Sequence, residues 1–161
     1  MQVKPLTDTF AKAVATSRAD HYAIDMGGGT TLSIYNVYGW TGAAQNKRQA
    51  LRTNQLFEAI IDEVSKQPEG PTILVGDFNG DVENFKALND LLTYQSWTDV
   101  GADAHIFGKP RSEGTCLGPN ASQPTRRDYV IANAQTLQLM DDFQVLPQQL
   151  FPVHSFLRIS L

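Results

Sequence analysis

The chain has 161 residues, which is the length of a single domain. Its hydrophobic content of 42% and charged content of 19% are ordinary for a globular protein. The net charge of −4 argues against a generally basic surface that binds nucleic acid through charge alone. An enzyme that meets phosphate groups through a divalent cation is not excluded, because the ion itself supplies the positive field.

The sequence also disfavours a membrane-spanning protein and a secreted protein. No apolar run approaches the ~20 residues needed to span a membrane, and the first twenty residues lack the pattern of a secretory signal. The single cysteine, Cys116, cannot form an internal disulfide, which fits a reducing compartment. We therefore expect an intracellular protein, cytoplasmic or nuclear, without a membrane span.

The chain alternates strand and helix patterns after a weakly patterned start. Residues 1–25 are poorly defined, with a short helix capped by Asp8 as their main signal. Gly27-Gly28-Gly29 predicts a hairpin turn, because neither Lys-Ser/Thr nor a helix follows, as a phosphate loop would require. The remaining predicted elements are a strand at 31–38, a helix at 46–66, a strand at 72–76, a helix from Asp81 to Leu92, a loop at 93–114, and strands at 115–117, 126–132, 137–145 and 153–159. This order predicts a mixed α/β layer.

The segment with the clearest chemical signal follows the strand at 72–76. That strand is β-branched and apolar, which is typical of a strand buried on both faces. Asp77 and Asn79 come next and are two residues apart, so in an extended backbone they project from one side while Phe78 points into the core. An ordinary Asp-Phe-Asn-Gly turn is the alternative interpretation.

Two distant residues complete a candidate site. Asp128 lies near the start of the predicted strand at 126–132 and His154 near the start of the predicted strand at 153–159, and groups near strand ends can converge. A carboxylate beside an imidazole fixes the tautomer of the ring and favours its protonated form. Phosphodiester hydrolysis needs an oriented water, donors to the phosphoryl oxygens and usually a divalent metal. The other two histidines, His21 and His105, fall outside this pattern and are predicted to be solvated loop residues.

From about Leu32 to Leu161 the sequence resembles the endonuclease/exonuclease/phosphatase superfamily, which includes abasic-site endonucleases and DNase I-like enzymes. The resemblance rests on four short motifs in matching order, which are Asn36-Val37-Tyr38, Gly76-Asp77-Phe78-Asn79, Arg126-Arg127-Asp128-Tyr129 and His154-Ser155. It implies the fold class α/β (α+β sandwich type), a partial DNase I-like four-layer sandwich whose mixed sheet carries two covering helices. Residues 26–161 would form this partial domain, and residues 1–25 would precede it.

The resemblance also implies roles for individual residues. Asp77 would orient or deprotonate the attacking water, and Asn79 would bind a phosphoryl oxygen or help Asp77 to hold Mg²⁺ or Mn²⁺. His154, oriented by Asp128, would stabilise charge on phosphorus in the transition state. For three further residues that match the family, two roles remain open. Tyr38 is either a phosphate contact or a half-buried strand tyrosine, Thr115 binds substrate or is structural, and Arg126 contacts phosphate or pairs with a carboxylate.

Two positions depart from the family pattern. The family binds its metal chiefly through a Glu in the first half of the domain, but this chain has no Glu before Glu58. Val153 stands where the family has an Asp before the final His. Loss of two hard oxygen ligands weakens Mg²⁺ binding, because Mg²⁺ relies on few carboxylates in a strict octahedron.

These observations leave two functions open. In the first, the chain is a metal-dependent phosphodiesterase or endonuclease-like hydrolase that acts on nucleic acid or another phosphoester. Alternatively, it is a truncated, catalytically impaired remnant that serves in binding or interaction. The resemblance covers the later portion of the family domain, so one sheet face would be left open. We expect a fragment of a longer protein, a partner chain or a repacking by residues 1–25 to cover that face.

Overall fold

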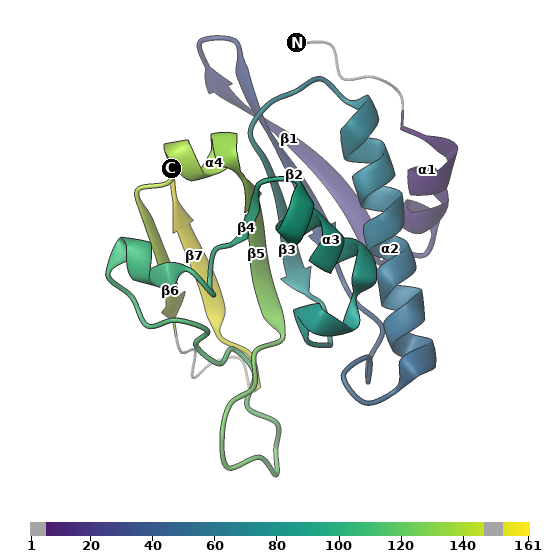
Figure 1. Ribbon diagram of the computed structural model, residues 1–161, viewed down its shortest axis with the longest axis vertical. Coiled ribbons are helices and arrows are strands. Elements are labelled where there is room, and N and C mark those ends of the chain that lie inside the picture. Colours follow the sequence, from purple (N-terminus) through teal and green to yellow (C-terminus); the bar gives the residue numbers. More distant parts are fainter. Residues whose placement is uncertain (1–5, 147–152) are drawn as a thin grey trace.

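The computed structural model describes residues 6–146 and 153–161 (Figure 1). Five strands form a mixed sheet in the order β1-β2-β3-β5-β4, and β6 and β7 form a separate antiparallel pair. The strands are β1 (Ala19–Gly27), β2 (Thr30–Val37), β3 (Thr72–Asp77), β4 (Trp97–Asp99), β5 (Asp128–Asn133), β6 (Asp142–Leu146) and β7 (Phe156–Ser160). The helices are α1 (Asp8–Ala15), α2 (Lys47–Lys66), α3 (Lys86–Tyr94) and α4 (Ala134–Leu139), with 3-10 turns η1 (Val82–Asn84) and η2 (Ala104–Phe107). The α/β fold class predicted from the sequence is confirmed.

The middle strand of the sheet is β3, as its apolar run predicts. It pairs in parallel with β2 and antiparallel with β5, and Thr72, Ile73 and Leu74 are buried. The crossover from β2 to β3 runs through α2, which is the connection that a parallel pair requires. The predicted hairpin turn at Gly27-Gly28-Gly29 joins β1 to β2.

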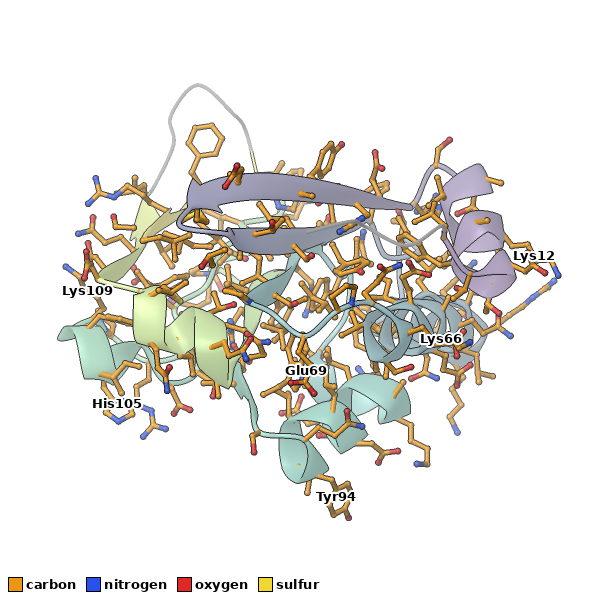
Figure 2. The ribbon with its side chains drawn as sticks, turned by 90° about the horizontal axis from the view of Figure 1, so that it is seen from above. Lys12, Lys66, Glu69, Tyr94, His105 and Lys109 are labelled. Atoms are coloured by element: carbon orange, nitrogen blue, oxygen red, sulfur yellow. The ribbon has the colours of Figure 1, made fainter. Side chains whose placement is uncertain are left out.

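The helices α2 and α3 cover one face of this sheet, and α1 packs beside α2 (Figures 1 and 2). Asn46 caps α2, because its side chain accepts a hydrogen bond of 2.9 Å from the backbone N–H of Arg48. Aromatic rings fill the space between helices and sheet, with Phe57 of α2 lying 4.8 Å from Phe78 and 5.2 Å from Phe85 between ring centroids. This layer is the larger part of the core.

The opposite face of the sheet is only partly covered. A second apolar cluster joins Ile73 and Val130 of the sheet to Phe143 of β6 and to η2. On β1, however, Tyr22, Ile24 and Met26 are 52%, 45% and 41% exposed. Among the described residues, no helix is both long and apolar enough to cross a membrane.

Several predicted boundaries are wrong. The run at 137–145 is not one strand, because α4 occupies its start and β6 begins only at Asp142. The predicted loop at 93–114 contains β4 and η2. Asp81 makes no capping hydrogen bond, and α3 starts four residues later than a helix capped there would.

The early part of the chain is more regular than its sequence pattern indicates. Residues 8–27 form α1 and the whole of β1, and Phe10 and Ala13 of α1 are buried in the main core. The cap of α1 is Thr7 rather than Asp8, since the Thr7 side chain accepts from the backbone N–H of Phe10.

His21 is not a solvated loop residue. It lies on β1, and its ring is stacked on that of buried Tyr35 at 4.5 Å between centroids. Its Nε2 atom is buried and has no hydrogen-bond partner among the described residues. The buried carboxylate of Glu63 approaches the same pair of rings.

This burial predicts a pH dependence of stability. Burial lowers the pKa of His21 below its usual value, although Glu63 and Asp20 act in the opposite direction. The unfolded chain therefore binds more protons than the folded chain as pH falls below about 6.5, so acid removes stability that is present at higher pH. His21→Phe, which keeps a ring on Tyr35, should lose less unfolding free energy than the unmodified chain between about pH 7.5 and about pH 5.5. Denaturant unfolding at both pH values measures this, and equal losses in the two proteins would contradict it.

Candidate active site

The candidate site lies at the edge of the sheet where β3 ends and β5 begins. Asp77 is the last residue of β3 and Asp128 is the first residue of β5, and the antiparallel register pairs them directly. Both side chains are largely shielded, with 17% and 16% exposed. The backbone ladder therefore holds two carboxylates side by side.

His154 is brought to these carboxylates by a short backbone bridge. The segment 115–117, a predicted strand, forms an isolated bridge in which Cys116 pairs with His154, and the Ser155 N–H donates to the Thr115 carbonyl at 2.7 Å. The Nδ1 atom of His154 lies 2.9 Å from Oδ2 of Asp128, and its Nε2 lies 3.9 Å from Oδ2 of Asp77. The contact with Asp128 occupies Nδ1 of the ring, and Nε2 faces Asp77.

Asn79 holds the carboxylate of Asp77 in position. Its backbone N–H donates to Oδ1 of Asp77 at 2.8 Å, and its side-chain Nδ2 donates to Oδ2 at 3.2 Å. The same Nδ2 donates to the carbonyl of Gly39 at 3.1 Å. Phe78, between the two polar residues, is fully buried, so the predicted alternation at this strand end is confirmed.

The pKa of Asp77 is raised above its usual value. Burial of the carboxyl group is the main cause, and the neighbouring Asp128 adds to it. The hydrogen bond from the Asn79 N–H, together with the charges of His154 and Arg127, opposes this rise. A carboxylate with a higher proton affinity is a better general base, provided that it is ionised at the working pH.

Neither a family model nor a curated protein matches the sequence, but solved structures match the fold. An AP endonuclease from Archaeoglobus fulgidus superposes with a TM-score of 0.67 at 16% identity, over 97% of this chain and 68% of its own length. The Neisseria 3′ phosphatase NExo, solved with a product DNA hairpin, gives 0.65 at 17% identity over 89% and 64%. The Xenopus laevis APE2 catalytic domain gives 0.62 at 18% identity over 88% and 55%.

The chain shares the fold of these solved nuclease and phosphatase structures. The resemblance seen in the sequence is thus confirmed at the level of fold. An endonuclease/exonuclease/phosphatase family protein from Leptotrichia buccalis also matches, with a TM-score of 0.57 at 16% identity. The chain covers 51–68% of the lengths of these similar chains, so it corresponds to a part of them.

Three side chains of this fold could hold a metal ion. One ligand atom from each of Asp77, Asp128 and His154 lies within 4.8 Å of the others. Two carboxylates and one imidazole suit a divalent cation that accepts nitrogen, such as Mn²⁺, better than Mg²⁺, which prefers oxygen and needs a near-ideal octahedron. Val153 contributes no ligand atom, and the sequence-based ligand Asn79 engages its amide nitrogen with Asp77 and Gly39.

The other candidate residues lie around the site with different environments. Thr115 is 1% exposed, and its hydroxyl oxygen accepts from the backbone N–H groups of Arg127 and Asp128, both at 3.0 Å. Arg126 forms an ion pair with Asp99 through both terminal nitrogens. These contacts favour the structural reading for Thr115 and the carboxylate-pairing reading for Arg126.

Tyr38 is 46% exposed, so its phenol is accessible to a ligand. Sequence reasoning missed the surroundings of this tyrosine, which include Arg18 at 4.9 Å from the ring centroid and Trp40 in the next loop. The sequence offers no signal for Arg18, because its partners become neighbours only in the folded sheet.

Two glycines allow the backbone to close tightly beneath the site. A Cβ atom on Gly76 would lie 2.0 Å from the carbonyl oxygen of Val37, and one on Gly39 would lie 2.1 Å from that of Phe78. Gly76 also has φ of +135°. The approach of β2 to β3 at this edge therefore requires glycine at both positions.

We expect Gly76→Ala to destabilise the protein by at least about 2 kcal/mol, through backbone strain and a clash with a carbonyl that cannot move away. Gly28→Ala is the matched control, because Gly28 also has positive φ but no atom of the described residues lies within 4 Å of its added Cβ. It should cost only about 1 kcal/mol. Denaturant unfolding of both variants tests this, and equal losses would show that the close approach is unimportant.

Replacing Thr115 with Val should leave two backbone N–H groups beneath Asp128 without their acceptor. The expected loss is about 2 kcal/mol or more of unfolding free energy. Thr115→Ser keeps the oxygen and should lose much less. Equal stability of the Val and Ser variants, measured by thermal and denaturant unfolding, would contradict this role for the hydroxyl.

Proposed function

We propose that this chain carries the catalytic end of a divalent-cation-dependent hydrolase that acts on phosphate esters of nucleic acid. The observation that carries the proposal is the joined set Asp77, His154 and Asp128 at the sheet edge of this fold. Proteins of the same fold are described as an AP endonuclease and as a 3′ phosphatase bound to product DNA. Those descriptions make nucleic acid the first substrate to test.

Each residue has a role that its contacts support. Asp77 accepts a hydrogen bond from the attacking water and takes its proton, and its raised pKa favours that transfer. Asn79 fixes the direction of the Asp77 carboxylate through two donated hydrogen bonds. His154 gives one N–H to Asp128, which leaves Nε2 to donate to a phosphoryl oxygen when the ring is protonated.

A bound divalent cation would add Lewis-acid stabilisation of the charge on the phosphoryl oxygens. Asp77 is the ligand best placed to hold it, because Asp128 is already engaged with His154. When Nε2 of His154 carries no proton it is a second possible ligand beside Asp77, and such a carboxylate–imidazole pair favours Mn²⁺ over Mg²⁺. Tyr38, with its exposed phenol, is the nearest further candidate for a contact with phosphate.

A second candidate function is binding without hydrolysis. Val153 favours it, because this residue has no side-chain ligand atom beside His154, where the family pattern has an Asp. The exposed apolar side chains Tyr22, Ile24 and Met26 on β1 also suit a surface that binds a partner chain.

Nicking of supercoiled DNA in Mn²⁺ or Mg²⁺ separates the two functions. The hydrolase proposal predicts faster nicking in Mn²⁺, a rise in melting temperature with Mn²⁺, and a loss of about 10²-fold or more in Asp77→Ala. Asp90→Ala is the control, because Asp90 lies on α3, where its half-exposed carboxylate pairs with Lys86.

Nicking that survives in Asp77→Ala would overturn the proposed role of this carboxylate. A folded protein that neither nicks DNA nor shifts its melting temperature with Mn²⁺ would favour the binding function.

A further inference from the structure

The cationic side chains of this protein are divided into two groups along the chain. Every Lys and Arg from Lys66 onward forms an ion pair with a carboxylate. Within the described part of the chain, the earlier cations form no ion pair, and these are Lys12, Arg18, Lys47, Arg48 and Arg52. The net charge of −4 therefore hides a local surplus of positive charge.

These unpaired cations lie on neighbouring elements. Lys12 is in the last turn of α1, Arg18 precedes β1, and the other three are in the first half of α2. Figure 1 shows α1 beside α2, and shows α2 beginning at the end of the molecule where β3 ends. Lys12 projects outward from α1 in Figure 2. A hollow of about 330 Å³ lies between the two helices and is lined in part by Lys12, Trp40 and Arg52.

Trp40 holds two of the arginines in place. The guanidinium carbons of Arg18 and Arg52 lie 3.8 Å and 3.2 Å from its ring centroid. The indole is fixed in turn, since the backbone N–H of Trp40 donates to the buried hydroxyl of Thr53 at 2.8 Å. Stacking orients a guanidinium without neutralising it, so its remaining N–H groups stay available to an anionic oxygen.

One carbonyl oxygen connects this group of cations to the catalytic edge. The carbonyl of Gly39 accepts from Nη1 of Arg18 at 2.9 Å and from Nδ2 of Asn79 at 3.1 Å. Asn79 in turn donates to Asp77. Arg18 is therefore separated from the proposed general base by a single backbone group and one amide side chain.

We propose that Lys12, Arg18, Arg52, Lys47 and Arg48 form a cationic track that binds the backbone phosphates of a nucleic-acid strand next to the candidate active site. This inference rests on the proposed function and extends it to the substrate. Arg18 and Arg52 present pre-oriented guanidinium forks, which suit phosphate oxygens. Lys47 and Arg48 are exposed at the start of α2, one helical turn from Arg52, and continue the track along the surface. Such contacts position a strand without reading its sequence.

Salt-dependent binding of a fluorescent DNA oligonucleotide tests the track. Anisotropy is measured with EDTA present, for single-stranded and duplex forms, so that binding is followed without cleavage. Arg18→Gln/Arg52→Gln should weaken binding about tenfold or more at low salt, and should lower the slope of log K against log salt by about 1 for each phosphate group that the variant no longer binds. Arg111→Gln/Arg158→Gln removes the same charge from paired residues elsewhere and should change little.

A second variant guards against a folding defect in the first. Lys47→Gln/Arg48→Gln changes two exposed side chains and should reduce affinity and salt slope in the same direction, with an unchanged melting temperature. Anisotropy in EDTA follows binding separately from hydrolysis, and the proposed general base Asp77 is not one of the track residues. A protein that binds DNA but fails to nick it would therefore remove the proposed hydrolase function and leave the track intact.

Three results would overturn the track. They are the absence of DNA binding by the folded wild-type chain at low salt, equal affinities for the track and control variants, and stronger binding of poly-glutamate than of the oligonucleotide. The last result would assign the surface to an acidic polypeptide.

Discussion

The antiparallel pairing of β3 with β5 determines the geometry of the whole site. It fixes Asp77 opposite Asp128 at a shielded sheet edge, where two negative charges repel each other and water screens them poorly. The surrounding groups relieve that repulsion: His154 lies against both carboxylates, and Asn79 donates twice to Asp77. Two carboxylates held this close attract positive charge, which an imidazolium or a metal ion can supply.

This negative centre borders a positive surface, and the two share a backbone group. The Gly39 carbonyl accepts from Arg18 on one side and from Asn79 on the other. The close approach at Gly76 and Gly39 makes that sharing feasible, because any larger residue would push β2 away from the end of β3. Tight backbone packing thus links the guanidinium of Arg18 to the carboxylate of Asp77 through Gly39 and Asn79, although these two charged groups do not themselves form an ion pair.

Local sequence patterns predicted the features that depend on neighbours along the chain. The buried strand before Asp77 and the helix beginning at Asn46 follow from β-branched and helical periodicity. The short segment 134–146 could not be divided in this way, because an apolar run of that length fits a helix or a strand equally well. Its division depends on Asn133, which caps α4 by accepting from the N–H of Thr136.

Features that depend on distant residues could not be read from local patterns. Strand-end positions suggest that Asp128 and His154 can approach Asp77, but only the resemblance of four separate motifs assigns them to one site. No local signal shows that Asp99 forms an ion pair with Arg126, since that pair forms only after β4 joins β5. The partner of each cation, and therefore which cations have none, becomes visible only in the folded chain.

The exposed apolar side of β1 bears on how the isolated chain behaves in solution. β1 is an edge strand of the sheet, and it shows Tyr22, Ile24 and Met26 to water. Removing such surface from water is favourable by about 25 cal/mol per Å². An edge strand with apolar side chains is also a template for pairing with another chain. Self-association at β1 would alter binding and unfolding titrations without changing the catalytic edge. Protein concentration and mild detergent should therefore be varied in such measurements.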